Sequence, residues 1–300
     1  MTAPVDLSVI ICTRNRPELL AAALGGLAGR GPEVELIVVD SASDGPETER
    51  VARAADAIYV RCDRPGLSLA RNRGVATATA DLVAFTDDDC VPDPTWADAV
   101  RAGFADDRIG LVTGPIRADR EARLATSINL HDEPMRLTAQ SDPFEIGHGA
   151  NMAFRRQALI DGGPFDEVMG PGAPFQAAED IDLMRRVLGA GWEGIFDVRV
   201  SLSHTQWRTT REALRTYYRY GIGAGAFAAK LERVGGTGRS VVTVRSRLWD
   251  ASGKAIKAIR TGHQTAVLAN LVISAGIVAG ARRARRLPVE AELFVSRPVR

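Results

Sequence analysis

The chain has 300 residues, 45% of them hydrophobic, so it can bury a sizeable core and form one large α/β domain with an appendage. Its formal net charge of +1 argues against a nucleic-acid partner and against an acidic tail. The three cysteines, Cys12, Cys62 and Cys90, lack CxxC and His-flanked spacing, which argues against a zinc site or a disulfide framework and favours a reducing compartment. The N-terminus lacks the basic and apolar regions of a signal peptide, so we expect a cytoplasmic protein.

Lysine is nearly absent from the sequence, and arginine carries almost all of the positive charge. The only lysines are Lys230, Lys254 and Lys257. The chain before Lys230 therefore offers no lysine for catalysis or for a phosphate-binding P-loop.

The first 110 residues alternate apolar runs with helical segments, a rhythm that is typical of a parallel sheet. We expect strands at 7–12, 34–39, 58–60 and 82–85, and helices at 18–28, 45–55 and 68–79. Polar residues follow three of these strands: Thr13-Arg14-Asn15, Asp40 and Asp87-Asp88-Asp89. The carboxyl ends of parallel strands share one edge of a sheet, so these groups should converge on one crevice. No G-x-G-x-x-G follows the first strand, which counts against a classical dinucleotide fold.

The acidic triplet at 87–89 is the most informative feature of this first half. Three uncompensated like charges at one strand end raise each other's pKa, so an unliganded fold gains nothing from them. A bound divalent cation would remove the conflict. The alternative interpretation is a solvated surface turn, in which the three carboxylates bind nothing.

Order fades in the segment 121–143, which we expect to be an irregular insertion, and returns at Gly147 and Gly149, just before Asn151. Glycines at these positions would let the backbone approach a ligand closely, although a tight turn explains them as well. Further along, Glu179 and Asp180 open a predicted helix. Acids in a first helical turn also complement the helix dipole, so a capping role is the alternative to catalysis.

The C-terminal part is a different kind of sequence, and we expect two domains, 1–234 and 235–300, with a glycine-rich linker at 235–238. After the linker the chain is helical, basic and apolar. The apolar run 266–281 is shorter than a spanning helix needs, so we expect no membrane span. Packing on the catalytic domain, formation of a homodimer and peripheral contact with a membrane all remain open. Gly276 and Gly280 form a GxxxG motif, a weak signal for helix pairing here.

Taken in order, these elements resemble the family 2 glycosyltransferases of the GT-A fold. The resemblance covers residues 7–225 and rests on the segments 8–16, 38–44, 70–74, 87–89, 151–155 and 179–183. It implies an α/β GT-A fold with a mainly parallel central sheet, followed here by a helical C-terminal extension. It also implies a nucleotide-diphosphate sugar donor, with UDP as the expected type, and a Mn²⁺ or Mg²⁺ cofactor.

The resemblance also implies roles for the residues at the strand ends. Asp40 would accept a hydrogen bond from the ring nitrogen of a uracil-like base. Asp89 would bind the metal that bridges the two phosphates, and Asp87 would reach the ribose or a metal-bound water. His204 falls where many relatives have a further metal ligand, and an ordinary histidine near a strand end is the alternative. The other residues expected to contact the nucleotide sugar are Thr13, Arg14, Asn15, Arg71 and Asp88.

For catalysis the resemblance implies transfer with inversion, in which Asp180 takes the proton from the acceptor hydroxyl. Glu179 would orient Asp180 or hydrogen-bond the acceptor. Gly149, Asn151 and Trp192 are candidates for acceptor or sugar binding, and for Trp192 a core or edge position is the alternative. The sequence Gln206-Trp207-Arg208 lacks the Q-x-x-R-W spacing of the processive synthases, so we expect a non-processive enzyme.

Two rival functions remain to be weighed. Asp87 to Val91 also fits the D-x-D-x-[TV] signature of haloacid-dehalogenase-like phosphohydrolases, but those enzymes need a lysine and none precedes Lys230. A catalytically inactive nucleotide-sugar-binding protein should lack an acidic residue in the D-x-D or ED motif, and both motifs are intact. The sequence leaves the sugar open, and also the acceptor, which could be a glycan, a lipid-linked saccharide or a small molecule.

Overall fold

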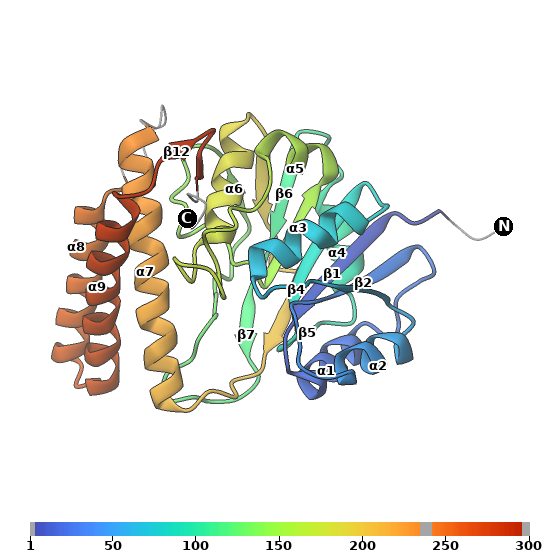
Figure 1. The fold of residues 1–300 in the computed structure, drawn as a ribbon, viewed down its shortest axis with the longest axis horizontal. Helices are drawn as coiled ribbons and strands as arrows, with labels where there is room; N and C mark the ends of the chain where they lie inside the picture. The colour runs from blue at the N-terminus through green and yellow to red at the C-terminus, as the bar shows by residue number, and fades with distance from the viewer. Residues whose placement is uncertain (1–3, 235–241, 296–300) are drawn as a thin grey trace.

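The computed structural model describes residues 4–234 and 242–295, and its centre is a large mixed sheet (Figure 1). Within these residues eight strands pair in the order β3-β2-β1-β4-β9-β6-β10-β8. Only β9 and β8 run antiparallel to their neighbours, so the prediction of a mainly parallel sheet is confirmed. The strands are β1 (Leu7–Thr13), β2 (Val34–Asp40), β3 (Ile58–Arg61), β4 (Leu82–Asp87), β6 (Ile109–Thr113), β8 (Met135–Leu137), β9 (Asn151–Arg155) and β10 (Glu193–Phe196).

Helices cover both faces of this sheet, because its central strands are apolar on both sides. In β1 every residue is buried: Ile10 and Cys12 belong to one core, and Leu7, Val9 and Ile11 belong to the other. The first core is closed by α3 (Leu67–Thr77), α5 (Arg156–Gly162), α6 (Glu179–Gly189) and α7 (Thr210–Val234). The second is closed by α1 (Pro17–Gly26), α2 (Glu47–Ala54) and α4 (Trp96–Gly103).

A second, smaller sheet lies beside the end of β4. It consists of β5 (Cys90–Pro92), β11 (Leu202–His204) and β7 (Ile116–Ala118). Because β11 pairs antiparallel with β5, His204 lies opposite Cys90 and next to the acidic triplet. The segment 121–143 between β7 and β9 is largely irregular, as expected, apart from the short strand β8.

The C-terminal extension is a helical layer at one side of the molecule (Figure 1). It contains α8 (Val244–Arg260), α9 (Gln264–Ala284) and the small hairpin β12 (Val289–Glu290) and β13 (Leu293–Phe294), and α9 packs along α7. Glycines make this contact close: a Cβ on Gly225 would overlap the carbonyl oxygen of Ile277, and one on Gly280 would overlap that of Ile222. The GxxxG motif therefore pairs two helices of the same chain.

Helix α9 is longer than its apolar run indicated. It has 21 residues, and its most apolar stretch of 18 residues has a mean hydropathy of 1.6. The helix is therefore sufficient in length and composition to cross a membrane, so the expectation that it is too short was wrong. One such helix is weak evidence for a span, and 28% of its most apolar stretch is buried inside the protein. The predicted boundary at 234 coincides with the end of α7, and the predicted linker at 235–238 lies outside the described residues.

Candidate active site

The polar strand ends meet at one edge of the central sheet, as predicted. In the register of the sheet, Thr13 of β1 lies opposite Asp40 of β2, and Cys12 lies opposite Asp87 of β4. Strand β9 runs the other way, so it begins at this edge with Asn151 opposite Thr86. The loops that follow β1, β2 and β4 and the loop that precedes β9 therefore enclose one site.

The middle acid of the triplet, Asp88, is fully buried and is held by the loop after β1. Its Oδ2 accepts a hydrogen bond of 2.6 Å from Thr13 Oγ1, and its Oδ1 lies 2.7 Å from a guanidinium nitrogen of Arg16. Burial raises the pKa of Asp88 to about 7, although the charge of Arg16 acts in the opposite direction. Asp88 therefore joins two loops and faces no solvent.

Asp89 lies in a ring of donors. Its Oδ2 accepts a hydrogen bond of 2.9 Å from Trp207 Nε1 and lies 3.3 Å from Arg16 and 3.5 Å from Arg208. Its Oδ1 lies 3.4 Å from His204 Nε2. Burial acts to raise the pKa of Asp89, but His204, Arg16 and the Trp207 N–H outweigh it, so the net shift is downward. Asp89 is thus held as a carboxylate.

These contacts correct one step of the sequence argument. The triplet was expected to carry three uncompensated charges, whereas each carboxylate has a guanidinium partner: Arg71 for Asp87, and Arg16 for both Asp88 and Asp89. The expectation failed because these arginines come from α3 and from the loop after β1, far from the triplet in sequence. Charge repulsion in the free protein therefore does not by itself require a cation.

The residues around Asp89 nevertheless fit a divalent metal ion. One ligand atom each of Asp89, Cys90 and His204 lies within 4.8 Å of the others. A carboxylate and an imidazole suit Mn²⁺, whereas the Cys90 thiol is a softer donor. Burial lowers the pKa of His204 despite the charge of Asp89, which favours the neutral imidazole. Asp87 was expected in this group, and the structure leaves it outside.

Gln206 fixes the orientation of the His204 ring. Its amide is anchored by the backbone of Thr126, which donates to Oε1 at 3.0 Å and accepts from Nε2 at 3.2 Å. The same Nε2 lies 2.7 Å from His204 Nδ1. Because an amide nitrogen can only donate, Nδ1 accepts this hydrogen bond, and the neutral ring carries its proton on Nε2, directed at Asp89. A metal-binding histidine has the opposite arrangement, so His204 would ligate an ion only after its contact with Gln206 changes.

Arg71 connects the two acidic motifs. It was expected to line the nucleotide crevice, but it is only 3% exposed and stacks over the Phe165 ring at 5.5 Å. One guanidinium nitrogen lies 2.7 Å from Glu179 and another lies 3.5 Å from Asp87. Arg71 therefore fixes the D-x-D strand end relative to helix α6.

The ED pair opens helix α6, immediately after Ala178, which adopts a left-handed conformation with φ of 70°. Glu179 is buried against Arg71, and burial together with the charge of Asp180 raises its pKa to about 7. Asp180 is the more accessible carboxylate of the two. Its Oδ2 accepts a hydrogen bond of 2.6 Å from the backbone N–H of Gly149, where a Cβ would lie 2.7 Å from Arg71 and 3.0 Å from Asp180. A side chain at position 149 would therefore displace Arg71 or Asp180.

Asp40 is fully buried at the end of β2. Its Oδ1 accepts from the backbone N–H of Ser43 at 2.7 Å, and its Oδ2 accepts from Tyr59 at 2.7 Å and from Arg61 at 3.0 Å. These contacts fix the carboxylate at the crevice end of the strand.

Arg14 and Asn15, the two predicted residues of the loop after β1, are exposed. Arg14 reaches the carbonyl oxygen of Ala42 at 3.3 Å, and Asn15 exchanges two hydrogen bonds with Asp44. These hydrogen bonds therefore join the loops after β1 and β2 beside Asp40.

Two of the candidates for acceptor or sugar binding are used elsewhere. The Asn151 side chain is buried, accepts from Trp96 Nε1, and donates to the carbonyl oxygens of Pro115 and Val200. Trp192 precedes β10 at the opposite edge of the sheet, where its Nε1 donates to Asp161. The expectation that these two side chains lie in the acceptor site was therefore wrong. Asn151 is committed to backbone carbonyl oxygens, and Trp192 lies at the opposite edge of the sheet.

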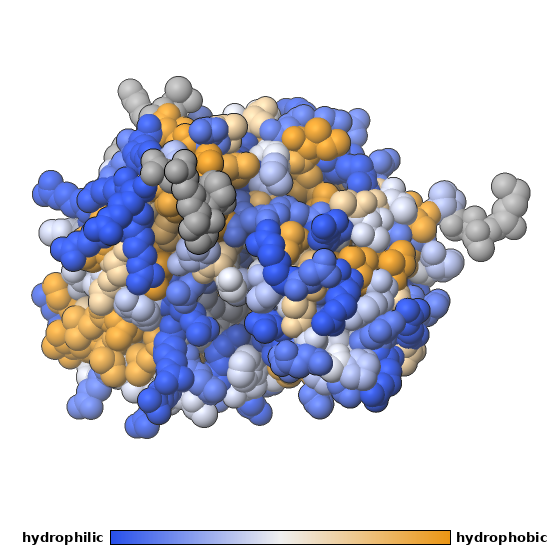
Figure 2. All heavy atoms as spheres, in the orientation of Figure 1, coloured by the Kyte–Doolittle hydropathy of each residue, from blue (hydrophilic) through white to orange (hydrophobic). Residues whose placement is uncertain are grey.

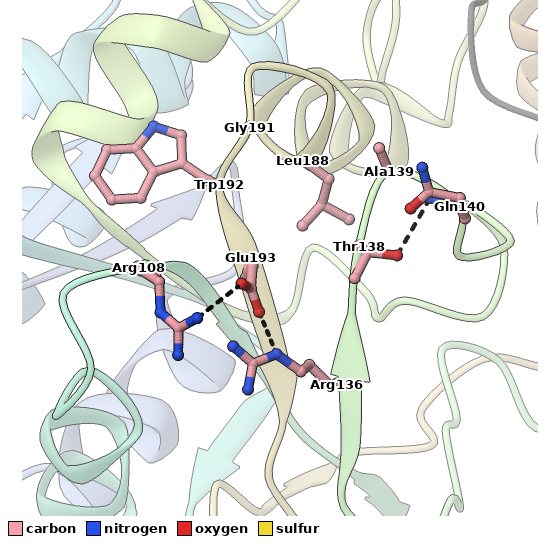
Figure 3. Close-up of a pocket in the computed structure, with 9 residues that line it drawn as sticks. All are labelled: Arg108, Arg136, Thr138, Ala139, Gln140, Leu188, Gly191, Trp192 and Glu193. Atoms are coloured by element: carbon pink, nitrogen blue, oxygen red, sulfur yellow. Dashed lines mark hydrogen bonds and ion pairs between the residues drawn. The ribbon is translucent and has the colours of Figure 1, made fainter.

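Trp192 borders a shallow surface pocket with Glu193 at its centre (Figure 3). Glu193 lies 3.7 Å from Arg108 and also pairs with Arg136. These ion pairs are more than half exposed on the arginine side and lie at the start of β6 and β10, so the pocket is separate from the sheet edge that carries Asp89.

Sequence reasoning missed Arg16, Trp207 and Arg208 as contacts of Asp89. Arg16 stands three residues after Thr13 in the first motif, so its position offered a signal. Trp207 and Arg208 follow His204 closely, and the antiparallel pairing of β11 with β5 is what brings them to the triplet. That pairing has no local sequence signature.

The glycosyl transferase family 2 model matches residues 8–163 of the chain. Among curated proteins, the chain is 27% identical over 241 residues to the pre-mycofactocin glycosyltransferase of Mycobacterium tuberculosis, covering 75% of this chain and 48% of that protein. It is 24% identical over 229 residues to glycosyltransferase AglE of Haloferax volcanii, covering 72% of each. The chain thus spans about half the length of the curated relative named first.

Two solved structures share the fold. Mannosyltransferase PcManGT from Pyrobaculum calidifontis, in complex with GDP-Man and Mn²⁺, superposes with a TM-score of 0.64 at 22% identity, covering 95% of this chain and 88% of that one. TarS residues 1–349 from S. aureus, in complex with UDP, gives a TM-score of 0.56 at 15% identity, covering 96% and 95%. The family model covers more than half of the chain, so this protein belongs to glycosyl transferase family 2 and has the GT-A fold.

Proposed function

We propose that this protein is an inverting, metal-dependent, non-processive glycosyltransferase. It would move a sugar from a nucleotide-diphosphate donor, of the UDP type, to an acceptor hydroxyl. One observation carries the proposal: an accessible carboxylate, Asp180, and a candidate metal pair, Asp89 and His204, belong to the same sheet edge, joined through Arg71.

The donor would bind across the loops after β1 and β2. Asp40 would accept a hydrogen bond from the ring N–H of the base once the exposed Arg61 side chain turns away from its Oδ2. Thr13, Arg14 and Asn15 border the same crevice. The solved neighbours support a nucleoside diphosphate, since one holds GDP-Man and the other holds UDP. The sugar itself would be selected by the loop that carries Gly149 and by the segment 121–143.

Asp89 and His204 would hold Mn²⁺ or Mg²⁺. The ion would supply positive charge to the diphosphate as it leaves. Arg16 and Arg208 already lie within 3.5 Å of Asp89, so the chain adds two guanidinium groups to the side of the site where that charge develops. Asp87 would reach the ribose or a metal-bound water.

Asp180 would act as the base that takes the proton from the acceptor hydroxyl. Its neighbour Glu179 is buried and paired with Arg71, so it would serve to position α6 and Arg71. Transfer with inversion is a single displacement, which needs one base and no nucleophilic carboxylate, and Asp180 would supply that base. The acceptor would be a glycan, a lipid-linked saccharide or a small molecule, and we propose a cytoplasmic location.

The test separates donor binding from chemistry. Thermal shifts with a panel of nucleotide-diphosphate sugars and Mn²⁺ should identify the donor, because a ligand that binds only the folded state raises its apparent stability. Asp180→Asn should keep that shift and lower turnover by roughly 10² to 10⁴. Asp161→Asn, on α5 beside Trp192, is the matched control. Near-normal turnover by the Asp180 variant would contradict the assignment of the base.

A further inference from the structure

The outer face of α8 and α9 is unusually apolar for a surface. Trp249, Ile256 and Ile259 on α8 and Leu268 and Leu271 on α9 are all exposed, and they make up five of the eleven exposed large hydrophobic residues in the part of the chain that the structure describes. The exposed fractions reach 79% for Trp249 and 63% for Ile259. Figure 2 shows apolar side chains gathered over this corner of the molecule. Contiguous patches of this kind mark interaction sites.

The inner face of the same helices contains small residues. Helix α8 buries Ala251, Ala255 and Ala258, and α9 buries Gly276 and Gly280 against α7. A helix that packs only on its own protein usually keeps its large apolar residues inside. Here, apart from Ile277, the buried residues of the two helices are small and the large apolar ones lie outside, so the outer face is suited to contact with something beyond the chain.

The distribution of charge along the chain indicates which kind of partner this outer face suits. Residues 1–234 contain 26 Lys and Arg against 34 Asp and Glu, a formal charge of −8, and residues 235–300 contain 12 against 3, a charge of +9. Lys254, Lys257 and Arg260 alternate with Ile256 and Ile259 along α8, and none of the three has an acidic partner among the described residues. Unpaired cations that alternate with apolar side chains suit an anionic lipid surface.

A second copy of the chain fits this face less well. In a twofold dimer the same patch would meet itself, so the positive extension of one copy would face that of the other. A membrane span fits less well too, because α9 is closely packed on α7 along Gly276 and Gly280. The geometry points to peripheral docking: α8 and α9 lie in the plane of an anionic membrane, with Trp249, Ile259 and Leu271 inserted at its surface.

Co-sedimentation of the full chain with lipid vesicles tests this proposal without any need for enzymatic activity. Vesicles of phosphatidylcholine alone should bind little protein, and vesicles with added phosphatidylglycerol should bind most of it. Lys257→Gln with Arg260→Gln should weaken binding by roughly tenfold or more, because each charge near such a surface contributes about fivefold. Arg73→Gln, an exposed arginine on α3, is the charge control.

Ile259→Ser and Leu271→Ser should each reduce binding about tenfold, and Ile160→Ser, an equally exposed isoleucine on α5, should not. High salt should release the protein. Protein that stays in the supernatant with both kinds of vesicle would overturn the proposal. If neither high salt nor alkali extracted the protein from the vesicles, a membrane span would replace the proposal. A dimer in solution that Ile259→Ser dissociates would also overturn it. If the protein bound no nucleotide-sugar donor, the proposed function would fail, but the vesicle-binding result would still stand.

Discussion

The sheet edge and the C-terminal helices bury opposite kinds of side chain. At the sheet edge Asp88, Arg71 and Glu179 are buried and ionisable, and each has a partner at 2.7 Å or less. On α8 and α9 the buried residues are alanines and glycines apart from Ile277, and five large apolar residues face outward. At the sheet edge the same residues therefore serve both stability and function, whereas on α8 and α9 different residues serve each.

In the first region the groups that hold the fold together also shape the site. Removing one partner of a buried pair leaves an uncompensated charge, so substitution should affect both stability and chemistry. In the second region the outward side chains contribute little to the fold, so substitution should change only what the surface binds. The following changes would break or sharpen this contrast.

The largest effect is expected at Asp89. Asp89→Ala removes the carboxylate of the candidate metal pair, leaves Arg208 without its anion and leaves Arg16 paired with Asp88 alone. Metal-supported binding of UDP should weaken, and transfer should fall by several orders of magnitude. Calorimetric titration of UDP with and without Mn²⁺ measures the first effect, with Asp93→Ala as the matched control. Equal UDP affinity in Mn²⁺ and in EDTA would contradict the metal role.

Lys230→Met should have the next largest effect, this time on folding. Lys230 on α7 is 1% exposed and lies 2.5 Å from Asp182 on α6 and 3.3 Å from Asp166. Breaking such a pair should lower the free energy of unfolding by about 3–5 kcal/mol. Urea denaturation measures it, and Lys257→Met on the surface of α8 should change it by less than about 0.5 kcal/mol. Equal decreases in the free energy of unfolding for the two variants would contradict the proposed difference between the sheet edge and the outer face of α8.

Glu179 should make stability depend on pH. Burial and Asp180 raise its pKa from 4.5 to about 7, so the folded protein holds a proton that the unfolded chain has already lost. The resulting stabilisation is present in full below pH 4.5 and is lost as the pH rises through about 7. Glu179→Gln should remove roughly 3 kcal/mol or less of that dependence. An unchanged slope of unfolding free energy against pH would show that Glu179 is already ionised when folded.

The smallest effect is expected at Leu271. Leu271→Ser should change the unfolding free energy by less than about 0.5 kcal/mol, because the side chain is 57% exposed. Leu183→Ser, at a fully buried position of α6, should cost roughly 2–5 kcal/mol in the same assay. A large loss at Leu271 would mean that the outer face is covered in solution, as in a dimer.

The first four strands and the convergence of Thr13, Asp40 and Asp87 were predictable because each depends on local patterns: buried runs, turn residues and the rule for parallel strand ends. The contacts of Asp89 were not predictable in this way. Trp207 and Arg208 reach it only through the pairing of β11 with β5, which joins residues more than a hundred positions apart.

The same limit explains the residues whose roles changed. Asn151 belongs to a recognisable motif, but only the fold reveals that backbone carbonyls of two distant loops use its amide group. Trp192 follows a helix closely in sequence, and nothing local indicates which end of β10 it occupies. Helix α9 was underestimated because polar Gln264 and Thr265 and the basic Arg282 and Arg283 belong to the helix without belonging to its apolar run.

The scarcity of lysine has a practical consequence for chemical labelling. Lys230 is buried, so Lys254 and Lys257, both exposed on α8, are the side-chain amines that a reagent can reach. Amine-directed dyes, crosslinkers or sensor chips would therefore attach the protein mainly through its basic, apolar face. A chip prepared in this way would present the D-x-D edge of the sheet to dissolved nucleotides while masking the face proposed to meet lipid. Coupling through an engineered cysteine elsewhere would be needed to measure both kinds of binding on one sensor.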